Sequence, residues 1–253
     1  MTWLGRVRIE LDTCGSTNDE VARRAAAGAA HGLVVTARAQ TAGRGRQGRA
    51  WYSGDRGNLY FSCLLRPALS PAQAPPLTLA AGLGVLDAIE DVSAAAGVDL
   101  PVALKWPNDV LIGARKVAGI LTEMNTRGSQ LEHVVVGIGI NLTTRAFPDE
   151  LAAIATSLAL AGVDAERDAF VAVLCERLAL WFDRFFAHGA GILTAAWMAR
   201  ARAAGTLGRL VRAETEAGLL VGRITGMADD GRLEVTDADG CMHRIAAGVH
   251  EYL

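Results

Sequence analysis

The residues of this chain best suited to chemistry form one short segment, Gly43-Arg44-Gly45-Arg46-Gln47-Gly48-Arg49-Ala50-Trp51. Glycine lets backbone N–H groups approach a ligand closely. Arginine presents five donors in a planar fork that fits a carboxylate or a phosphate. The pattern predicts a cationic loop that closes over an anionic, nucleotide-like ligand. The segment alone leaves a solvated turn and an RNA-binding Arg-Gly segment open as alternatives.

Further segments place polar residues where a ligand can reach them. Ser16-Thr17-Asn18 stands at a predicted strand-to-helix junction, which presents backbone N–H groups to a ligand, although plain helix capping would explain the same residues. Lys105 interrupts an apolar strand, and a buried ammonium is costly unless it is paired. Trp106-Pro107-Asn108-Asp109 predicts a rigid turn with two oxygen ligands suited to a magnesium-bound phosphate.

Lys116 and Asn141 belong to two later predicted strands. Lys116 enters a strand that ends in small residues, so its ammonium can reach a carboxylate or an α-phosphate; a solvated hairpin charge is the simpler alternative. Asn141 closes a β-branched run that contains Gly137 and Gly139. Glycines weaken a strand unless something approaches it closely, so this strand is expected to face a ligand or a packed backbone.

The composition describes a globular protein and not a general nucleic-acid binder. The 253 residues fit one large domain or one domain with a small appendage, and 51% of them are hydrophobic. A net charge of −2 lacks the basic excess of nucleic-acid binders, so the arginine cluster is local. Four widely spaced cysteines predict free thiols in a reducing compartment. Because no apolar leader or membrane-length run is present, a cytoplasmic protein without membrane contact is expected.

Hydrophobic periodicity predicts an α+β fold. Thr17 and Glu20 predict a capping box at the start of the first helix. A stripe that includes Phe170, Leu178 and Phe185 predicts core packing for the longest helix. The predicted strands cover residues 7–12, 33–39, 58–66, 102–106, 111–124 (with a hairpin at 113–114) and 132–142, and the predicted helices 17–28, 77–96, 166–188 and 192–203.

The pattern changes after Gly205 to short strands separated by Asp-Gly turns, which are hairpin signals. Strands are expected at 210–213, 219–227, 233–236 and 241–245. So small a unit is near the lower limit for independent folding, so it is expected to pack on the main domain. The chain is therefore predicted to consist of a ligand-binding domain at 1–204 and a small β-rich domain at 205–253.

Taken in order, three motifs resemble the biotin protein ligase family, and the resemblance extends over nearly the whole chain. They are the glycine-arginine loop, Lys105-Trp106-Pro107-Asn108-Asp109, and Arg115-Lys116-Val117-Ala118-Gly119-Ile120-Leu121. The resemblance implies a mixed β-sheet flanked by helices, of the class II synthetase type, followed by a small SH3-like β-barrel. It implies that ATP activates biotin to biotinyl-5′-AMP and that biotin is then transferred to a lysine of a biotin carboxyl carrier protein domain of a carboxylase. Residues 1–204 would then bind biotin and ATP as substrates, with Mg²⁺ as the metal.

The resemblance also implies roles for individual residues. The catalytic cations would be Arg46 and Lys116. The biotin contacts would be Ser16, Thr17, Asn18, Gln40, Arg44, Gly45, Arg46, Lys116 and Gly119. The ATP and adenylate contacts would be Arg46, Arg49, Trp51 (stacked on adenine), Asn108, Lys116 and Asn141, and Asp109 would be a magnesium ligand.

Two alternative functions remain open at this point. A lipoate or octanoate ligase would have the same fold, but such enzymes carry an Arg-Arg-x-x-Gly-Gly-type loop. A non-catalytic biotin-binding regulatory protein would keep the pocket without turnover. Only fifteen residues precede Ser16, so DNA binding by an N-terminal module is not expected, while a homodimer is compatible with the family. The end of the chain, Gly248-Val249-His250-Glu251-Tyr252-Leu253, lacks the arginine often found there in the family, which puts a nucleotide contact from the small domain in doubt.

Overall fold

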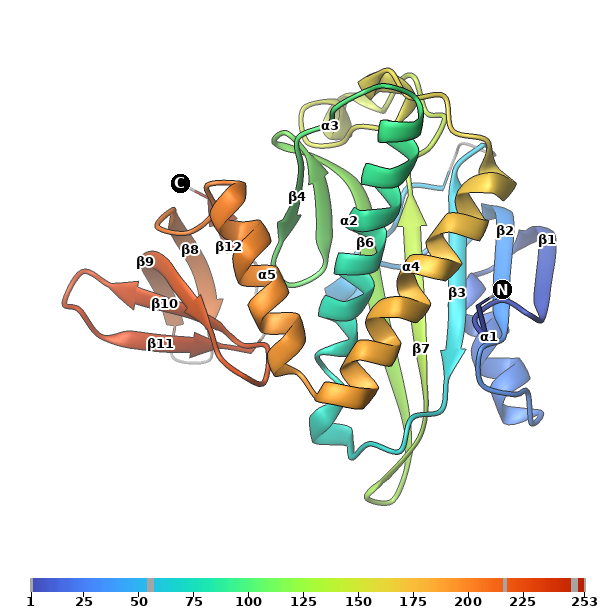
Figure 1. Cartoon of the computed structure of the whole chain (residues 1–253), viewed down its shortest axis with the longest axis horizontal. Coiled ribbons are helices and arrows are strands. Elements are labelled where there is room, and N and C mark those ends of the chain that lie inside the picture. The colour runs from blue at the N-terminus through green and yellow to red at the C-terminus, as the bar shows by residue number, and fades with distance from the viewer. Residues whose placement is uncertain (1, 54–56, 216–217, 247–249, 253) are drawn as a thin grey trace.

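The computed structural model describes residues 2–53, 57–215, 218–246 and 250–252. Figure 1 shows a large sheet with long helices against one face and a smaller sheet beside it. The helices and strands of the described residues are β1 (Arg8–Cys14), α1 (Thr17–Ala26), β2 (Val34–Gln40), β3 (Leu59–Leu65), α2 (Leu77–Ala95), β4 (Val102–Lys105), β5 (Asp109–Ile112), β6 (Arg115–Arg127), β7 (Gln130–Ile140), α3 (Asp149–Ala152), α4 (Arg167–His188), α5 (Gly191–Ala203), β8 (Leu210–Thr215), β9 (Gly218–Met227), β10 (Leu233–Asp237), β11 (Met242–Ile245) and β12 (His250–Tyr252).

The large sheet has the strand order β1-β2-β3-β7-β6-β5-β4. Strands β1 and β2 are parallel and are joined through helix α1, as parallel neighbours require a crossover. All other neighbours in this sheet are antiparallel. The prediction of a mixed sheet flanked by helices is therefore confirmed.

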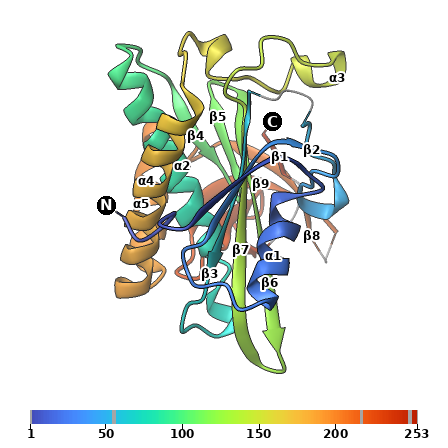
Figure 2. The same ribbon diagram turned by 90° about the vertical axis from the view of Figure 1, so that its right-hand side faces the viewer.

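Both faces of the large sheet are covered near its centre. Helices α2 and α4 lie on one face and α1 lies on the other (Figure 2). All seven residues of β3 are consequently buried: Phe61 and Cys63 join the main core with α2 and α4, and Leu64 joins a smaller apolar cluster with α1. Helix α1 packs on β2, β3 and β7. The neighbouring surface over β6 and β7 carries a cavity.

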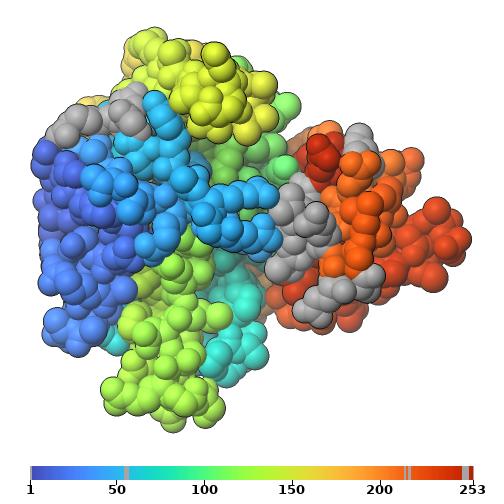
Figure 3. Space-filling view, turned by 180° about the vertical axis from the view of Figure 1, so that it is seen from behind, coloured from blue at the N-terminus to red at the C-terminus, as the bar shows by residue number. Residues whose placement is uncertain are grey.

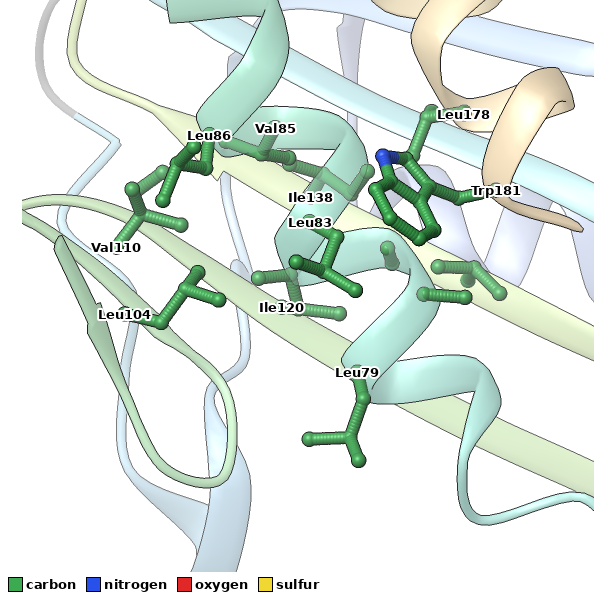
Figure 4. Packing of buried hydrophobic residues seen from close by; sticks show 14 of the residues in the cluster. Leu79, Leu83, Val85, Leu86, Leu104, Val110, Ile120, Ile138, Leu178 and Trp181 are labelled. Atoms are coloured by element: carbon green, nitrogen blue, oxygen red, sulfur yellow. The ribbon is translucent and has the colours of Figure 1, made fainter. Parts of the chain in front are cut away.

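Helices α2 and α4 pack closely, and a glycine permits the approach. A Cβ added at Gly84 of α2 would lie 2.9 Å from Leu178 Cδ2 and 3.1 Å from the Leu178 Cα of α4. Figure 4 shows Leu178 and Trp181 among the apolar side chains of α2 and the sheet. The stripe predicted as core on the longest helix is buried, which confirms that prediction; it consists of Phe170, Leu174, Leu178, Trp181 and Phe185.

The smaller sheet is antiparallel, with the order β11-β10-β9-β8-β12. Its inward side chains, Val211, Ile224 and Val235 among them, belong to the same apolar cluster as the main core. The indole N–H of Trp106 donates to the Gly231 carbonyl at 3.0 Å, which ties the β9–β10 turn to the end of β4. The small sheet therefore packs on the rest of the molecule, as its size predicted.

Some predicted caps and strand boundaries are wrong, because residues distant in the sequence take the place of local hydrogen-bond partners. The capping box at Thr17 and Glu20 is wrong: Ser16 is the N-cap, Thr17 bonds to Gln40, and Glu20 pairs with Arg24. Strand β5 starts two residues before the predicted strand at 111 because it pairs with β4 from its first residue. Helix α3 and strand β12 were not predicted, since both are too short to show periodicity.

Two expectations from composition can be compared with the described residues. All four cysteines are free, which confirms that prediction. Within the described ranges no helix combines the length and the apolar character needed to cross a lipid bilayer.

The contact between α2 and α4 generates a prediction. Gly84→Ala is expected to lower the free energy of unfolding by about 1–3 kcal/mol, because the new methyl group meets the backbone of Leu178. Gly82→Ala is the matched control: its Cβ would lie 3.5 Å from Leu104, an ordinary contact, and alanine favours the helix by up to about 1 kcal/mol. Urea unfolding followed by circular dichroism measures both; equal stabilities would contradict the close packing.

Candidate active site

A cavity of about 340 Å³ lies on the α1 side of the large sheet. Figure 3 views this face, where the light-blue segment that follows β2 lies across the green strands of the sheet and extends toward the orange C-terminal sheet. The cavity is lined by every residue predicted for the site: Ser16, Thr17, Asn18, Gln40, Arg44, Gly45, Arg46, Arg49, Trp51, Asn108, Asp109, Lys116, Gly119 and Asn141. Residues from six separate segments therefore meet at one place.

Glycines on β6 and β7 form the floor of the cavity. Gly119 and Gly139 are register partners, so they leave a patch of bare backbone on the sheet. The Trp51 ring occupies this patch, since a Cβ added at Gly139 would lie 2.4 Å from Trp51 Cε2. A Cβ at Gly137 would lie 2.0 Å from Asn18 Oδ1. The glycines do admit a close approach, but the groups that approach are these two side chains and not the packed backbone that the sequence analysis named.

One end of the cavity is a buried polar wall at the start of α1. Gln40 Oε1 accepts from the Thr17 N–H at 2.8 Å and from the Thr17 hydroxyl at 3.2 Å. The Ser62 hydroxyl lies 2.7 Å from Thr17 Oγ1 and 2.6 Å from Asn18 Oδ1. Ser16 makes no side-chain capping bond to the helix. Gln40 Oε1 is occupied by Thr17, and Gln40 Nε2 donates to Ser53 Oγ at 3.5 Å, so one amide N–H of Gln40 remains as a donor.

The glycine-arginine loop folds back on itself as a tight turn. The Gly45 N–H donates to the Arg49 carbonyl at 2.7 Å, and the Trp51 N–H donates to the Gly43 carbonyl at 2.9 Å. Gln47 adopts a left-handed φ of 56°, which reverses the chain direction. The turn carries the Trp51 ring over the floor.

Arg44 anchors the start of this loop to α1 and β6. Its guanidinium donates to both carboxylate oxygens of Asp19, at 2.8 and 2.7 Å, and to Glu123 at 3.3 Å. The hydrogen bond from Arg44 lowers the pKa of Asp19. Glu123 also accepts from Asn18 Nδ2 at 2.5 Å, which fixes the orientation of that amide. The fork of Arg44 is thus largely occupied by protein carboxylates.

Two cations, Arg46 and Lys116, stand in the middle of the cavity. Arg46 is half-buried, its Nη1 donates to Asn108 Oδ1 at 3.3 Å, and burial lowers its pKa. Lys116 Nζ lies 2.7 Å from Asp109 Oδ1 and 5.1 Å from the centre of the Trp51 ring. Guanidinium stays protonated in proteins despite such a shift. The pair can therefore bind an anion between the loop and the sheet.

Arg49 and Asn141 also line the cavity. Arg49 is exposed on the loop. Asn141 is buried at the end of β7, and its Nδ2 donates to the Thr156 carbonyl at 2.9 Å. That bond leaves its side-chain oxygen as an acceptor.

Apolar side chains form part of the cavity rim, here called the apolar lip. Phe147, Leu151 and Ile154 line it from the segment around α3, and Ile154 is 60% exposed. The Tyr52 ring lies 6.3 Å from that of Phe147. In the described residues the buried indole N–H of Trp51 has no hydrogen-bond acceptor. Buried donors are normally satisfied, so this one is suited to a ligand acceptor.

Sequence reasoning missed several residues that shape the cavity. Ser62 is a polar residue in a fully buried strand, and Glu123 is a charge that follows the apolar run within β6; both exceptions were visible in the sequence. Phe147, Leu151 and Ile154 gave no signal, because an irregular segment has no periodicity to interpret. In the described part of the chain no cluster of three or more His, Cys, Asp or Glu side chains is arranged to hold a metal ion.

The arrangement is suited to an elongated ligand with a polar ring at one end and an anion further along. The wall at Thr17 and Gln40 offers donors and acceptors in a buried setting, which suits a compact polar ring. The cations Arg46 and Lys116 can reduce the repulsion between two anionic groups that must react.

Comparison with known proteins agrees with this geometry. Residues 15–141 match the biotin/lipoate A/B protein ligase family, and residues 206–249 match the biotin protein ligase C-terminal domain. The chain is 36% identical over 244 residues to the bifunctional ligase/repressor BirA of Bacillus subtilis (strain 168), covering 94% of this chain and 71% of that protein. It is 38% identical over 238 residues to the biotin–[acetyl-CoA-carboxylase] ligase of Mycobacterium tuberculosis, covering 92% and 84%.

A solved structure shows the same architecture. The biotin protein ligase from Aquifex aeolicus in complex with biotin and ATP superimposes with a TM-score of 0.84 at 28% sequence identity. The superposition covers 98% of this chain and 100% of that one.

The contact between the glycine floor and the indole can be tested by a double-mutant cycle. Gly139→Ala is expected to lower the free energy of unfolding by about 1–3 kcal/mol, because the methyl group displaces the Trp51 ring. In a Trp51→Ala background the same substitution is expected to cost less than about 0.5 kcal/mol. Circular dichroism during urea unfolding gives all four values, and additive effects would show that the two residues are not in contact.

Proposed function

The chain belongs to the biotin/lipoate A/B protein ligase family, and from that premise we propose how its cavity performs biotin ligation. It is an ATP-dependent biotin–protein ligase, which converts biotin and ATP to biotinyl-5′-AMP and pyrophosphate and then transfers biotin to a protein lysine. Individual residues of the cavity each carry a distinct part of this activity.

The ureido ring of biotin binds the polar wall at the start of α1. A ureido group has two N–H donors and one carbonyl acceptor, so it needs both kinds of partner away from water. Gln40 offers one amide N–H, because its oxygen already accepts from Thr17 and its Nε2 donates once, to Ser53. The wall also includes the Ser16 hydroxyl, which makes no capping hydrogen bond to α1, and the Asn18 amide, which is oriented by its hydrogen bond to Glu123. The aliphatic tail then extends from this wall past Arg44 and Gly45 toward Arg46 and Lys116, all of which line the cavity.

Adenylation takes place between Arg46 and Lys116. A biotin carboxylate oxygen attacks the α-phosphorus of ATP, the bond from that phosphorus to the bridging oxygen breaks, and the electron pair leaves with pyrophosphate. No proton is transferred in this step. The two cations offset the repulsion between carboxylate and phosphate and stabilise the charge of the transition state. Asp109 holds Lys116 in place through the 2.7 Å ion pair.

The adenine ring binds beside Trp51. The indole provides a flat face, and Phe147, Leu151 and Ile154 provide apolar surface on the lip. Asn141 presents an oxygen that can accept from an amino group, and Arg49 and Asn108 lie where they can contact the nucleotide. Base–aromatic stacking favours this site, at about 1–3 kcal/mol per base.

Magnesium fits this site as a companion of the nucleotide. Mg²⁺ in nucleotide sites takes one or two protein carboxylates together with substrate phosphates. Among the described residues that line the cavity, Asp109 is the single acidic one, so its carboxylate would hold the ion. The side-chain oxygen of Asn108 would be a second ligand. When bound, the ion would neutralise phosphate charge and orient the leaving group.

The second step needs an acceptor lysine and little further chemistry. Biotinyl-5′-AMP is already activated, so the acceptor has only to be positioned and deprotonated. The acceptor we propose is a lysine of a biotin carboxyl carrier domain of a carboxylase, as the name of the Mycobacterium relative indicates. The loop that carries Arg46 keeps the adenylate away from water until the carrier docks.

One observation supports this assignment above the others. A buried polar wall at Thr17 and Gln40 and a cation pair at Arg46 and Lys116 line the same cavity. Biotinyl-5′-AMP has the matching order of a ureido ring, an aliphatic tail and a phosphate.

The activity itself is tested by biotin-dependent exchange of labelled pyrophosphate into ATP. Exchange is expected with biotin and not with lipoate or octanoate, because the wall is built for a ureido ring. Calorimetric binding of biotin without exchange would instead indicate a non-catalytic binding protein.

Lys116→Ala and Arg46→Gly separate the roles of the two cations. Lys116→Ala is expected to slow adenylate formation by about 100-fold or more while changing biotin affinity little, since its charge acts in the transition state. Arg46→Gly is expected to release biotinyl-5′-AMP into solution, because the loop no longer retains it. Single-turnover kinetics and chromatography of the free adenylate measure these effects. Equal losses of binding and rate in Lys116→Ala would assign that residue to ground-state binding alone.

A further inference from the structure

The polar wall of the cavity is supported from behind by two residues, Ser62 and Glu123. Ser62 lies within β3 with no exposed surface, and its hydroxyl reaches both Thr17 and Asn18. Glu123 lies on β6, and one of its carboxylate oxygens accepts from Asn18 Nδ2 at 2.5 Å. These four side chains therefore form one continuous chain of hydrogen bonds, which runs between a carboxylate and the hydroxyl of Thr17.

Glu123 fixes the orientation of the Asn18 amide. An ionised carboxylate has acceptors and no donor, so the Asn18 atom that faces it must be the amide nitrogen. The Leu121 carbonyl, 3.4 Å from the same nitrogen, adds a second acceptor on that side. Gly137 leaves space for the amide, since a Cβ there would lie 2.0 Å from Asn18 Oδ1. Asn18 Oδ1 is thus directed at Ser62, 2.6 Å away, and requires a donor from it.

The direction set by Glu123 continues to Thr17. A serine hydroxyl has a single proton, and two oxygens at 2.6 Å repel each other unless a proton lies between them. The Ser62 proton therefore goes to Asn18 Oδ1. Ser62 Oγ then offers only lone pairs to the Thr17 hydroxyl, 2.7 Å away, and accepts its proton. Gln40 Oε1, the other acceptor in reach of this hydroxyl, is farther away, at 3.2 Å, and already accepts from the Thr17 N–H at 2.8 Å.

This arrangement decides what the Thr17 hydroxyl can offer to a ligand. With its proton committed to Ser62, the hydroxyl presents only a lone pair to the cavity that it lines. Thr17 is 4% exposed, so a ligand group that meets this hydroxyl loses its contact with water. A ring N–H finds an acceptor there. A ring oxygen would face a lone pair and remain unpaired, which is costly for a buried polar group.

We propose that Glu123 and Ser62 are positioning residues that fix the direction of the hydrogen bonds in the wall, and that they make the cavity selective for a ligand with a ring N–H at Thr17. The proposal rests on the proposed biotin ligation, because the ureido group of biotin supplies that N–H. Neither residue has to touch biotin. The effect of Glu123 reaches the ligand through Asn18, Ser62 and Thr17.

Glu123→Gln tests the carboxylate and keeps the shape of the side chain. A glutamine side chain has one oxygen, and the guanidinium of Arg44, 3.3 Å from Glu123 Oε1, needs an acceptor there. The new amide nitrogen then faces Asn18, whose amide can turn over and donate to Ser62. The direction of the chain is reversed, and the Thr17 proton becomes free to be donated to a ligand. Ser62→Ala frees the same proton by removing its acceptor.

The readout is the ratio of two affinities measured by calorimetry. The ligands are biotin and the two cyclic carbamates in which an oxygen replaces one ring N–H of biotin. The parent protein is expected to bind biotin about 100-fold or more tightly than the carbamate that lacks the N–H at Thr17. Glu123→Gln and Ser62→Ala are each expected to lower this ratio to about tenfold, because the released proton of Thr17 can pair with the carbamate oxygen.

Two further measurements separate selectivity from general damage to the site. The rate of pyrophosphate exchange at saturating biotin and ATP is expected to stay near the parent value in both variants, because Arg46 and Lys116 are unchanged. Glu123 is 42% exposed, so its variant tests the proposal even where Ser62→Ala is destabilised.

Two matched controls lie away from the wall. Ser93→Ala removes a buried hydroxyl that donates to the Glu90 carbonyl in α2. Glu132→Gln neutralises a carboxylate that pairs with Arg127 on the β6–β7 hairpin. Both are expected to keep the affinity ratio of the parent.

The proposal fails on any of three results. Equal binding of biotin and both carbamates by the parent would show that Thr17 is not confined to accepting. An equal loss of affinity for biotin and the carbamates in both variants would assign Glu123 and Ser62 to the shape of the wall alone. A changed ratio in only one variant would show that the chain of hydrogen bonds is not the cause. Biotin-dependent exchange by the parent leaves the proposed function standing in each case, whereas its absence would contradict that function itself.

Discussion

The close approach of side chains to bare backbone on β6 and β7 is the constraint on which the site depends. Gly119 and Gly139 face each other in register, and Gly137 lies two residues along the same strand. Any Cβ at these positions would overlap Trp51 or Asn18. The opposite face of the same strands is filled by isoleucines and valines of the core. Because side chains alternate along a strand, one face of β6 and β7 packs in the core while the other face, with its glycines, forms the cavity floor.

Charge in the cavity is arranged so that some cations are held and others remain available. Arg44 is occupied by Asp19 and Glu123, so it serves as an anchor of the loop. Lys116 is held by Asp109 but remains beside the ring of Trp51. A cation paired with one carboxylate keeps its position, while an excess of positive charge across the site still attracts the substrate anions. The enzyme therefore does not rely on a single strongly perturbed group.

The fold and the site were predictable from sequence to different degrees. Long, strongly periodic elements such as α2, α4 and β7 were found nearly to their ends, because burial of one face imposes the period. Every residue assigned through the family motifs lines the cavity, although the roles of these residues remain proposals. The capping box at Thr17 was wrong because Gln40, 23 positions away, accepts from Thr17. Contacts over such distances leave no local pattern.

The sequence by itself determined the periodic elements, the glycine-arginine loop and the motif order that identifies the family. Local propensity and hydrophobic period act over neighbouring residues, so one chain is enough to see them. Only the tertiary structure decided which residues support the cavity wall, such as Ser62 behind Asn18, and which carboxylate pairs with Lys116. It also brought Tyr252 of the small sheet to Lys105, 147 positions earlier in the chain. The two sheets are joined because they bury apolar surface against each other. The residues that meet there are distant in the sequence, so no local pattern predicts their contact.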